Sequence, residues 1–147
     1  EELKNLIFEN FKEQKQIILL SELKEFIKKP ISSSKNFNVV KVTNAFFTHA
    51  YFINKSAAKS ILEFNFPVKT IADNYTFFNI YCGVKIFGID PFIVDQDKKN
   101  HPTTIKFSKK LKSKINKKNK KFLFKKRIYK LKTRFIKLFV PFSSHSK

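Results

Sequence analysis

Short apolar runs separated by polar residues fill the first part of the chain. Apolar residues at helical spacing, from Leu3 to Phe11, predict an amphipathic helix over residues 2–14. The unbroken apolar run at residues 17–20 predicts a strand that is buried on both faces. The chain therefore begins with one helix that has a single apolar face and one strand that has two.

Polar residues then interrupt the pattern twice. Ser21 is suited to cap a short helical turn over residues 22–29, which Pro30 would end. Residues 32–36 are polar and predict a loop, and residues 37–45 predict the next strand. This part of the chain is expected to connect two buried strands.

Residues 46–53 alternate between two largely apolar sets, which predicts a strand covered on both faces. Asn54 is a natural N-cap for a helix that ends before Pro67. Asp73 is expected to cap a second helix, which contains Tyr75, Phe78 and Tyr81.

Two shorter strands are expected after these helices. Gly83 and Gly88 bracket one over residues 84–87, and residues 92–94 form the other. Strands that alternate with helices indicate the α/β class rather than a helix bundle or a sandwich.

Charge divides the chain into two unequal parts. Residues 1–97 contain 12 Lys and Arg and 11 Asp and Glu, whereas residues 98–147 contain 19 Lys and Arg and no acidic residue. The formal net charge of +20 therefore comes almost entirely from the second part. A near-neutral α/β segment is followed by a cationic tail.

Apolar residues return at helical spacing near the end of this tail, and basic residues fill the other positions. The sequence therefore predicts a basic amphipathic helix that ends at Pro141. Its apolar positions are Phe124, Ile128, Leu131, Phe135 and Leu138, and its basic positions are Lys125, Lys126, Arg127, Lys130, Lys132, Arg134 and Lys137.

Three interpretations of the tail follow. Segregated apolar and cationic faces favour binding of residues 107–140 to an anionic membrane surface. Nucleic acid is the rival partner, because the charge is ample and aromatic residues such as Tyr129 could stack on bases, but no nucleic-acid-binding motif accompanies them. The third interpretation is a solvated lysine-rich extension without a partner.

Composition excludes several classes of protein. The single cysteine, Cys82, rules out an internal disulfide or a cysteine zinc cluster and is expected to be a small buried side chain. The first residues lack the pattern of a signal peptide, and no apolar run is long enough to span a bilayer.

An ordered set of residues between positions 45 and 105 resembles the glycosyltransferase family 25 enzymes of bacterial lipooligosaccharide synthesis. The family pattern combines a Thr-His-x-Tyr segment, a helix of small residues, a proline, an Ala-Asp-Asp step, a proline followed by glutamine, and a Ser-x-Ile segment. The matching segments are Thr48-His49-Ala50-Tyr51 with Ile53 and Asn54, Ala57-Ala58-Lys59, Ile61-Leu62, Pro67, Ala72-Asp73-Asn74, Ile89-Asp90-Pro91, Val94-Asp95-Gln96 and Thr103-Thr104-Ile105. The order and the spacing of these segments both fit the family.

This resemblance implies a fold and a reaction. Family members have a GT-A-like fold and are similar to inverting transferases that use a UDP-sugar, usually UDP-galactose, and a lipid-linked saccharide acceptor. They also need a divalent cation, Mn²⁺ or Mg²⁺, held by an acidic motif. That motif and the nucleotide-binding half are absent from this sequence, so we expect a C-terminal portion that has little or no activity alone.

The resemblance also assigns roles to individual residues. Asp73 matches the first Asp of the family's Asp-Asp step and becomes the candidate base or acceptor-binding carboxylate, with a helix cap as the ordinary alternative. Asn74 replaces the second Asp, so it keeps a hydrogen-bonding group and loses the charge, and it is assigned to substrate binding. His49 is the second candidate catalytic residue, and a packed core histidine is its alternative.

Four further residues are assigned to substrate binding. Thr48 accompanies His49 in the predicted strand, where packing is the simpler role. Asp95 and Gln96 follow a strand end, where α/β folds place ligands, and a solvated turn is their alternative. Thr104 lies in the departing segment and is a candidate for closing over the donor.

The sequence thus predicts an α/β unit over residues 1–105, the C-terminal half of a GT-A-like fold, followed by a basic helical tail over residues 106–147. It predicts a peripheral location on the inner face of a bacterial cytoplasmic membrane. The alternative is a non-catalytic basic module that binds an anionic membrane or nucleic acid.

Overall fold

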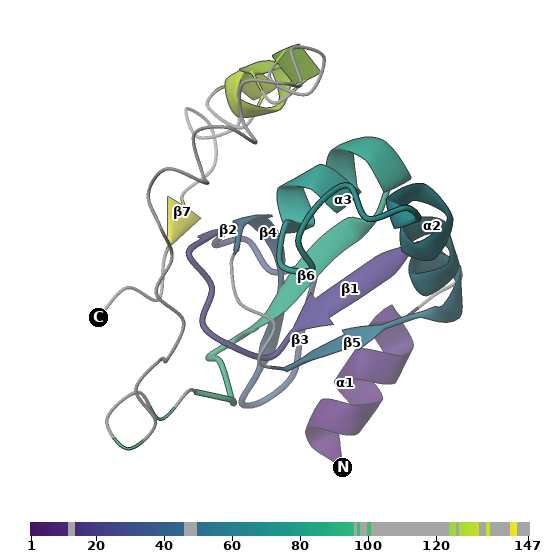
Figure 1. The fold of residues 1–147 in the computed structure, drawn as a ribbon. Coiled ribbons are helices and arrows are strands. Elements are labelled where there is room, and N and C mark those ends of the chain that lie inside the picture. The colour runs from purple at the N-terminus through teal and green to yellow at the C-terminus, as the bar shows by residue number, and fades with distance from the viewer. Residues whose placement is uncertain are drawn as a thin grey trace.

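A computed structural model of the chain describes residues 1–11, 14–45, 50–95, 97, 100, 124–125, 127–132, 135 and 142–143. It has mixed α/β content, with helices on both sides of one sheet (Figure 1). In chain order the elements are α1 (Glu2–Asn10), β1 (Gln16–Leu19), β2 (Glu25–Ile27), β3 (Ser32–Ser33), β4 (Asn38–Asn44), β5 (Tyr51–Ile53), α2 (Lys55–Asn65), α3 (Tyr75–Cys82), β6 (Lys85–Asp90) and β7 (Phe142–Ser143).

The sheet is mixed, and its strand order is β5-β1-β6-β4-β2-β7, with β3 paired to β4. β1 and β6 run parallel near its centre, and the other pairs are antiparallel. All four residues of β1 are buried, which confirms the strand predicted at residues 17–20. β4 confirms the strand predicted at residues 37–45.

Two apolar clusters cover the two faces of the sheet. Ile18 packs with Leu6 and Ile7 of α1 on one face, whereas Ile17 and Leu19 pack with residues of α2 and α3 on the other. Successive residues of a strand point to opposite faces, so β1 contributes to both clusters. The result is three layers, α1, the sheet, and the α2–α3 pair (Figure 1).

The predicted helices were correct in type and less accurate at their ends. α1 forms as predicted but ends at Asn10 rather than at residue 14. α2 begins directly after Asn54, whose side-chain oxygen accepts a hydrogen bond from the Ala57 N–H at 3.0 Å. This confirms Asn54 as an N-cap.

The helical turn predicted at residues 22–29 is wrong, because the chain forms strand β2 there. Phe26 of β2 is buried and lies opposite Val42 of β4. The pairing with β4 satisfies backbone groups that a local turn would have satisfied, and it buries a phenylalanine as well. The predicted loop at residues 32–36 also contributes two residues, β3, to the sheet.

The strand predicted at residues 46–53 is not covered on both faces. Its described part is β5, which lies at the end of the sheet order beside β1, and Tyr51 and Phe52 are exposed there. An apolar residue at a sheet edge has fewer neighbours than its pattern predicts. Residues 46–49 lie outside the described part.

The two glycines have different roles. Gly83 ends α3 in the left-handed conformation, with a φ of 67°, which a glycine adopts without strain. Gly88 was predicted to end a strand but lies inside β6. A Cβ atom there would approach both δ-carbons of Leu23 to 2.6 Å, so the absent side chain makes room for Leu23.

The described part of the tail packs against the α/β unit. We call residues 124–125, 127–132 and 135, which are all helical, the tail helix. After it, β7 pairs with β2, opposite Phe26 and Ile27. The sequence predicted the helix but not its return to the sheet. Within the described residues no helix is both long and apolar enough to cross a membrane.

Candidate functional site

The loop between α2 and α3 carries the predicted catalytic carboxylate. The side chain of Asn65, the last residue of α2, holds this loop, because its oxygen accepts hydrogen bonds from the N–H groups of Lys69 and Thr70 at 2.8 and 3.0 Å. The Asn74 amide donates to the Thr70 hydroxyl at 2.8 Å. Side-chain hydrogen bonds therefore support both ends of the loop.

Asn74, not Asp73, caps α3. The Asn74 side-chain oxygen accepts a hydrogen bond from the Phe77 N–H at 3.2 Å, and α3 begins at Tyr75. The prediction that Asp73 is the cap is wrong by one residue, because Asn is as good a cap as Asp and Asn74 stands directly before the first helical turn. The half-buried Asp73 carboxylate is left out of the cap.

Tyr51 and Asp73 both affect the titration of the buried phenol of Tyr75. Burial raises the pKa of Tyr75 most, and the nearby acidic groups of Tyr51 and Asp73 raise it further. The Tyr75 hydroxyl therefore stays protonated at neutral pH and remains a hydrogen-bond donor. The sequence analysis assigned no site role to Tyr51 or Tyr75, because nothing in the local pattern links them to Asp73.

Of these residues, Tyr51 lies at the carboxyl end of β1. Tyr51 pairs with Leu19, the last residue of β1, in the sheet register. The carboxyl ends of parallel strands are where open α/β sheets bind ligands.

Asp95 lies beyond the same end of β1. The N–H groups of Ile93 and Val94 both donate to the Leu20 carbonyl, at 3.0 and 3.1 Å. Val94 also forms a parallel bridge with Ser21, and the exposed Asp95 follows directly. The strand predicted at residues 92–94 is thus only this bridge, but it brings Asp95 to the edge where the sequence expected it.

Four of the predicted site residues cannot be placed. His49, Thr48, Gln96 and Thr104 lie outside the described residues. Their assignment to catalysis or substrate binding stays a prediction. Of the predicted set, Asp73, Asn74 and Asp95 are described.

The described residues do not fit a bound divalent cation. No group of three His, Cys, Asp or Glu side chains among them comes together as a metal site.

Cys82 is buried, as predicted, and burial raises the pKa of its thiol. That thiol is therefore a poor nucleophile and a poor metal ligand.

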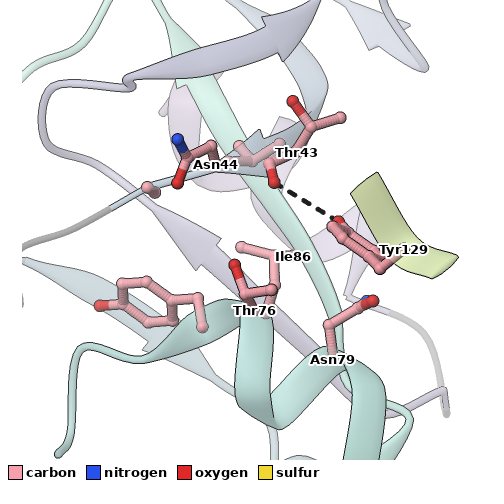
Figure 2. A pocket seen from close by; sticks show the side chains of 9 residues that line it. Thr43, Asn44, Thr76, Asn79, Ile86 and Tyr129 are labelled. Atoms are coloured by element: carbon pink, nitrogen blue, oxygen red, sulfur yellow. Dashed lines mark hydrogen bonds between the residues drawn. The ribbon is translucent and has the colours of Figure 1, made fainter. Parts of the chain in front are cut away.

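A small pocket marks the contact between the tail helix and the α/β unit (Figure 2). Tyr129 reaches from the tail helix toward β4, where its hydroxyl donates to the Thr43 carbonyl at 3.4 Å. The cavity volume is about 10 Å³, enough for about one water molecule and far too small for a sugar. Its lining residues are Val42, Thr43, Asn44, Ala45, Tyr75, Thr76, Asn79, Ile86 and Tyr129.

Comparisons with known proteins found no match. No protein-family model matches the chain, and neither does any curated protein or solved structure. The resemblance to family 25 glycosyltransferases therefore rests on the residues quoted above.

Proposed function

We propose that this chain is the acceptor side of a family 25-like glycosyltransferase and that Asp73 is its working carboxylate. The observation that supports this most is the position of Asp73. It is half-buried directly before α3, it is not used as the helix cap, and it affects the titration of the buried Tyr75.

In the proposed reaction the Asp73 carboxylate accepts the proton of an acceptor hydroxyl as that oxygen attacks the anomeric carbon of a UDP-hexose. The bond between the anomeric carbon and the diphosphate oxygen breaks on the opposite side, and UDP leaves with the electron pair. Configuration at the anomeric carbon is therefore inverted.

The loop that carries Asp73 also exposes apolar side chains. Phe66, Val68 and Ile71 are all strongly exposed in the segment between α2 and Asp73. The carbon-bound hydrogens of a pyranose ring form an apolar face that packs on such side chains. This surface favours a saccharide acceptor at the Asp73 loop.

A divalent cation, Mn²⁺ or Mg²⁺, would stabilise the leaving diphosphate in a full-length enzyme of this family. The described residues do not fit that ion, so no step above depends on it. We expect little or no transfer by the 147-residue chain alone. Manganese-dependent transfer from UDP-galactose by this chain would contradict that expectation.

The acceptor can be tested by binding rather than by activity. A lipooligosaccharide core oligosaccharide, titrated into the isotope-labelled chain, is expected to shift the amide resonances of residues 66–74. Asp73→Asn should weaken binding at least about tenfold, because a hydrogen bond to a charged group contributes roughly 1.5–3 kcal/mol. Glu63→Gln, which alters an exposed carboxylate on α2, should leave the affinity unchanged.

Either of two results would overturn the proposal. One is an oligosaccharide that causes no shift in the unmodified chain. The other is an Asp73→Asn variant that binds the oligosaccharide as tightly as the unmodified chain.

Under this proposal the acceptor is lipid-linked, and the protein works at the inner face of a bacterial cytoplasmic membrane. The second candidate function is a non-catalytic basic module. One observation favours it independently, the exposed apolar face of the tail helix, and its consequence is developed next.

A further inference from the structure

The tail helix turns its apolar residues away from the protein. Phe124, Ile128, Leu131 and Phe135 follow one another at spacings of four, three and four residues, so they form one narrow stripe along the helix. Their exposed fractions are 64%, 39%, 62% and 64%. We call these four residues the apolar stripe.

Another side of the same helix contacts the α/β unit. The Tyr129 hydroxyl donates to the Thr43 carbonyl, and the Lys125 ammonium lies 4.8 Å from the centre of the Tyr81 ring (Figure 2 shows the first contact). Tyr129 follows Ile128 and is therefore rotated about 100° from it around the helix. These two contacts hold the helix with its stripe outward.

Basic residues flank the apolar stripe on the described helix. Lys125, Arg127, Lys130 and Lys132 are all exposed. The sequence has no acidic residue after Asp97, so the tail itself supplies no negative side chain to offset their charge. An outward apolar stripe between cations complements the surface of a bilayer with anionic lipids, where side chains enter the acyl boundary and cations meet phosphates.

Two other occupants fit this surface less well. Single-stranded nucleic acid stacks on aromatic rings, but Ile128 and Leu131 in the centre of the stripe are aliphatic. A second copy would bring two strongly cationic helices together without acidic partners, and the like charges would repel. An anionic bilayer offers an apolar acyl region for the aliphatic centre of the stripe and phosphate groups for the cations on its flanks.

We propose that the apolar stripe and its flanking cations bind the surface of a bilayer that contains anionic phospholipid. The helix lies in the plane of that surface and does not cross it. This inference does not depend on the proposed transferase function, because it uses only the tail helix and its contacts.

Vesicle sedimentation of the full chain tests the stripe. Binding is expected to vesicles of mixed phosphatidylglycerol and phosphatidylcholine, and to be much weaker to phosphatidylcholine alone. The double variant Phe124→Ser, Leu131→Ser should lower the affinity for the anionic vesicles at least about a hundredfold, since each buried anchor is expected to contribute about tenfold or more.

Matched variants separate the stripe from general effects. Phe8 of α1 is 65% exposed, about as much as Phe124, and Ile31 is also exposed, so Phe8→Ser, Ile31→Ser removes similar surface elsewhere and should bind normally. Arg127→Gln, Lys130→Gln should weaken anionic binding about thirtyfold, at roughly 1 kcal/mol per charge. Lys28→Gln, Lys29→Gln should have little effect. Circular dichroism of each variant checks that the fold is retained.

Three results would overturn the proposal. The stripe variant and the unmodified chain could bind anionic vesicles equally. The unmodified chain could bind an oligonucleotide and not vesicles, which would assign the surface to nucleic acid. Sedimentation equilibrium could find that the unmodified chain is a dimer and that the stripe variant is a monomer. That result would assign the stripe to contact with a second copy of the chain.

Discussion

Two amphipathic helices of the described chain, α1 and the tail helix, differ in what covers their apolar faces. α1 buries Leu6 and Ile7 against the sheet, whereas the tail helix exposes all four residues of its apolar stripe. Both helices have the same kind of hydrophobic pattern. Such a pattern shows that a helix has an apolar face but not what covers that face.

Charge accounts for part of the difference. Residues 1–97 have nearly equal numbers of cations and anions, and the buried apolar residues of the described chain all lie in that part. The tail has cations alone, so its helix is surrounded by charges that prefer water or an anionic partner. The comparison therefore predicts different costs for the same substitution in the two regions.

The largest contrast is expected between two leucines. Leu23→Ala should destabilise the fold by about 2–5 kcal/mol, because Leu23 is fully buried and packs over Gly88. Leu131→Ala in the tail helix should change the free energy of unfolding by less than about 0.5 kcal/mol. Urea denaturation of both variants measures this. Equal losses would mean that the tail helix packs as a core element.

A smaller effect distinguishes the two residues before α3. Asn74→Ala should cost about 1 kcal/mol through loss of the helix cap. Asp73→Ala should cost only a few tenths of a kcal/mol, within the range of ordinary surface substitutions. Thermal denaturation of both variants shows which residue caps the helix. A larger loss of stability in Asp73→Ala than in Asn74→Ala would mean that Asp73 is the cap.

Loss of the contact between the tail helix and the α/β unit should destabilise the protein less than Leu23→Ala or Asn74→Ala does. Tyr129→Ala is expected to speed hydrogen exchange in the tail helix while the stability of the α/β unit falls by under about 1 kcal/mol. Tyr129→Phe keeps the ring and loses only the hydrogen bond to Thr43, so its effect should be smaller. A global loss of stability in Tyr129→Ala would show that the two regions unfold together.

The smallest effect concerns high pH. The pKa of Tyr75 in the folded protein is raised above its ordinary value of 10, first by burial and then by Tyr51 and Asp73. Its contribution to stability is therefore complete below pH 10 and is lost as the pH rises through the folded pKa. Urea denaturation at a series of alkaline pH values should show a shallower decline for Tyr75→Phe. The same decline in both proteins would exclude Tyr75 as the cause.

Several elements could be predicted because their signals are local. The apolar run of β1 and the Asn54 cap of α2 each depend on a few adjacent residues, and both are confirmed. Their stability is a matter of short-range spacing and of one side-chain hydrogen bond. An element predicted from such local features forms in the folded protein when no contact with a distant segment favours a different structure.

The incorrect predictions share a different cause. Residues 22–29 became a strand because β4 lies beside them, and β5 is exposed because it is at the sheet edge. The local pattern shows neither that β4 lies beside residues 22–29 nor that β5 lies at the edge of the sheet. In the candidate site, Asp73 and Asp95 were predicted, but the effect of Tyr51 on Tyr75 joins residues from two separate elements.

The amino-acid sequence by itself determined the α/β class, the division into a near-neutral unit and a cationic tail, and the narrow apolar stripe of the tail helix. Only the tertiary structure decided that Asn74 caps α3 and leaves Asp73 out of the cap, and that Tyr129 holds the stripe outward. Periodicity and charge are properties of neighbouring residues. Burial depends on elements that are distant in the chain, and folding alone brings them together.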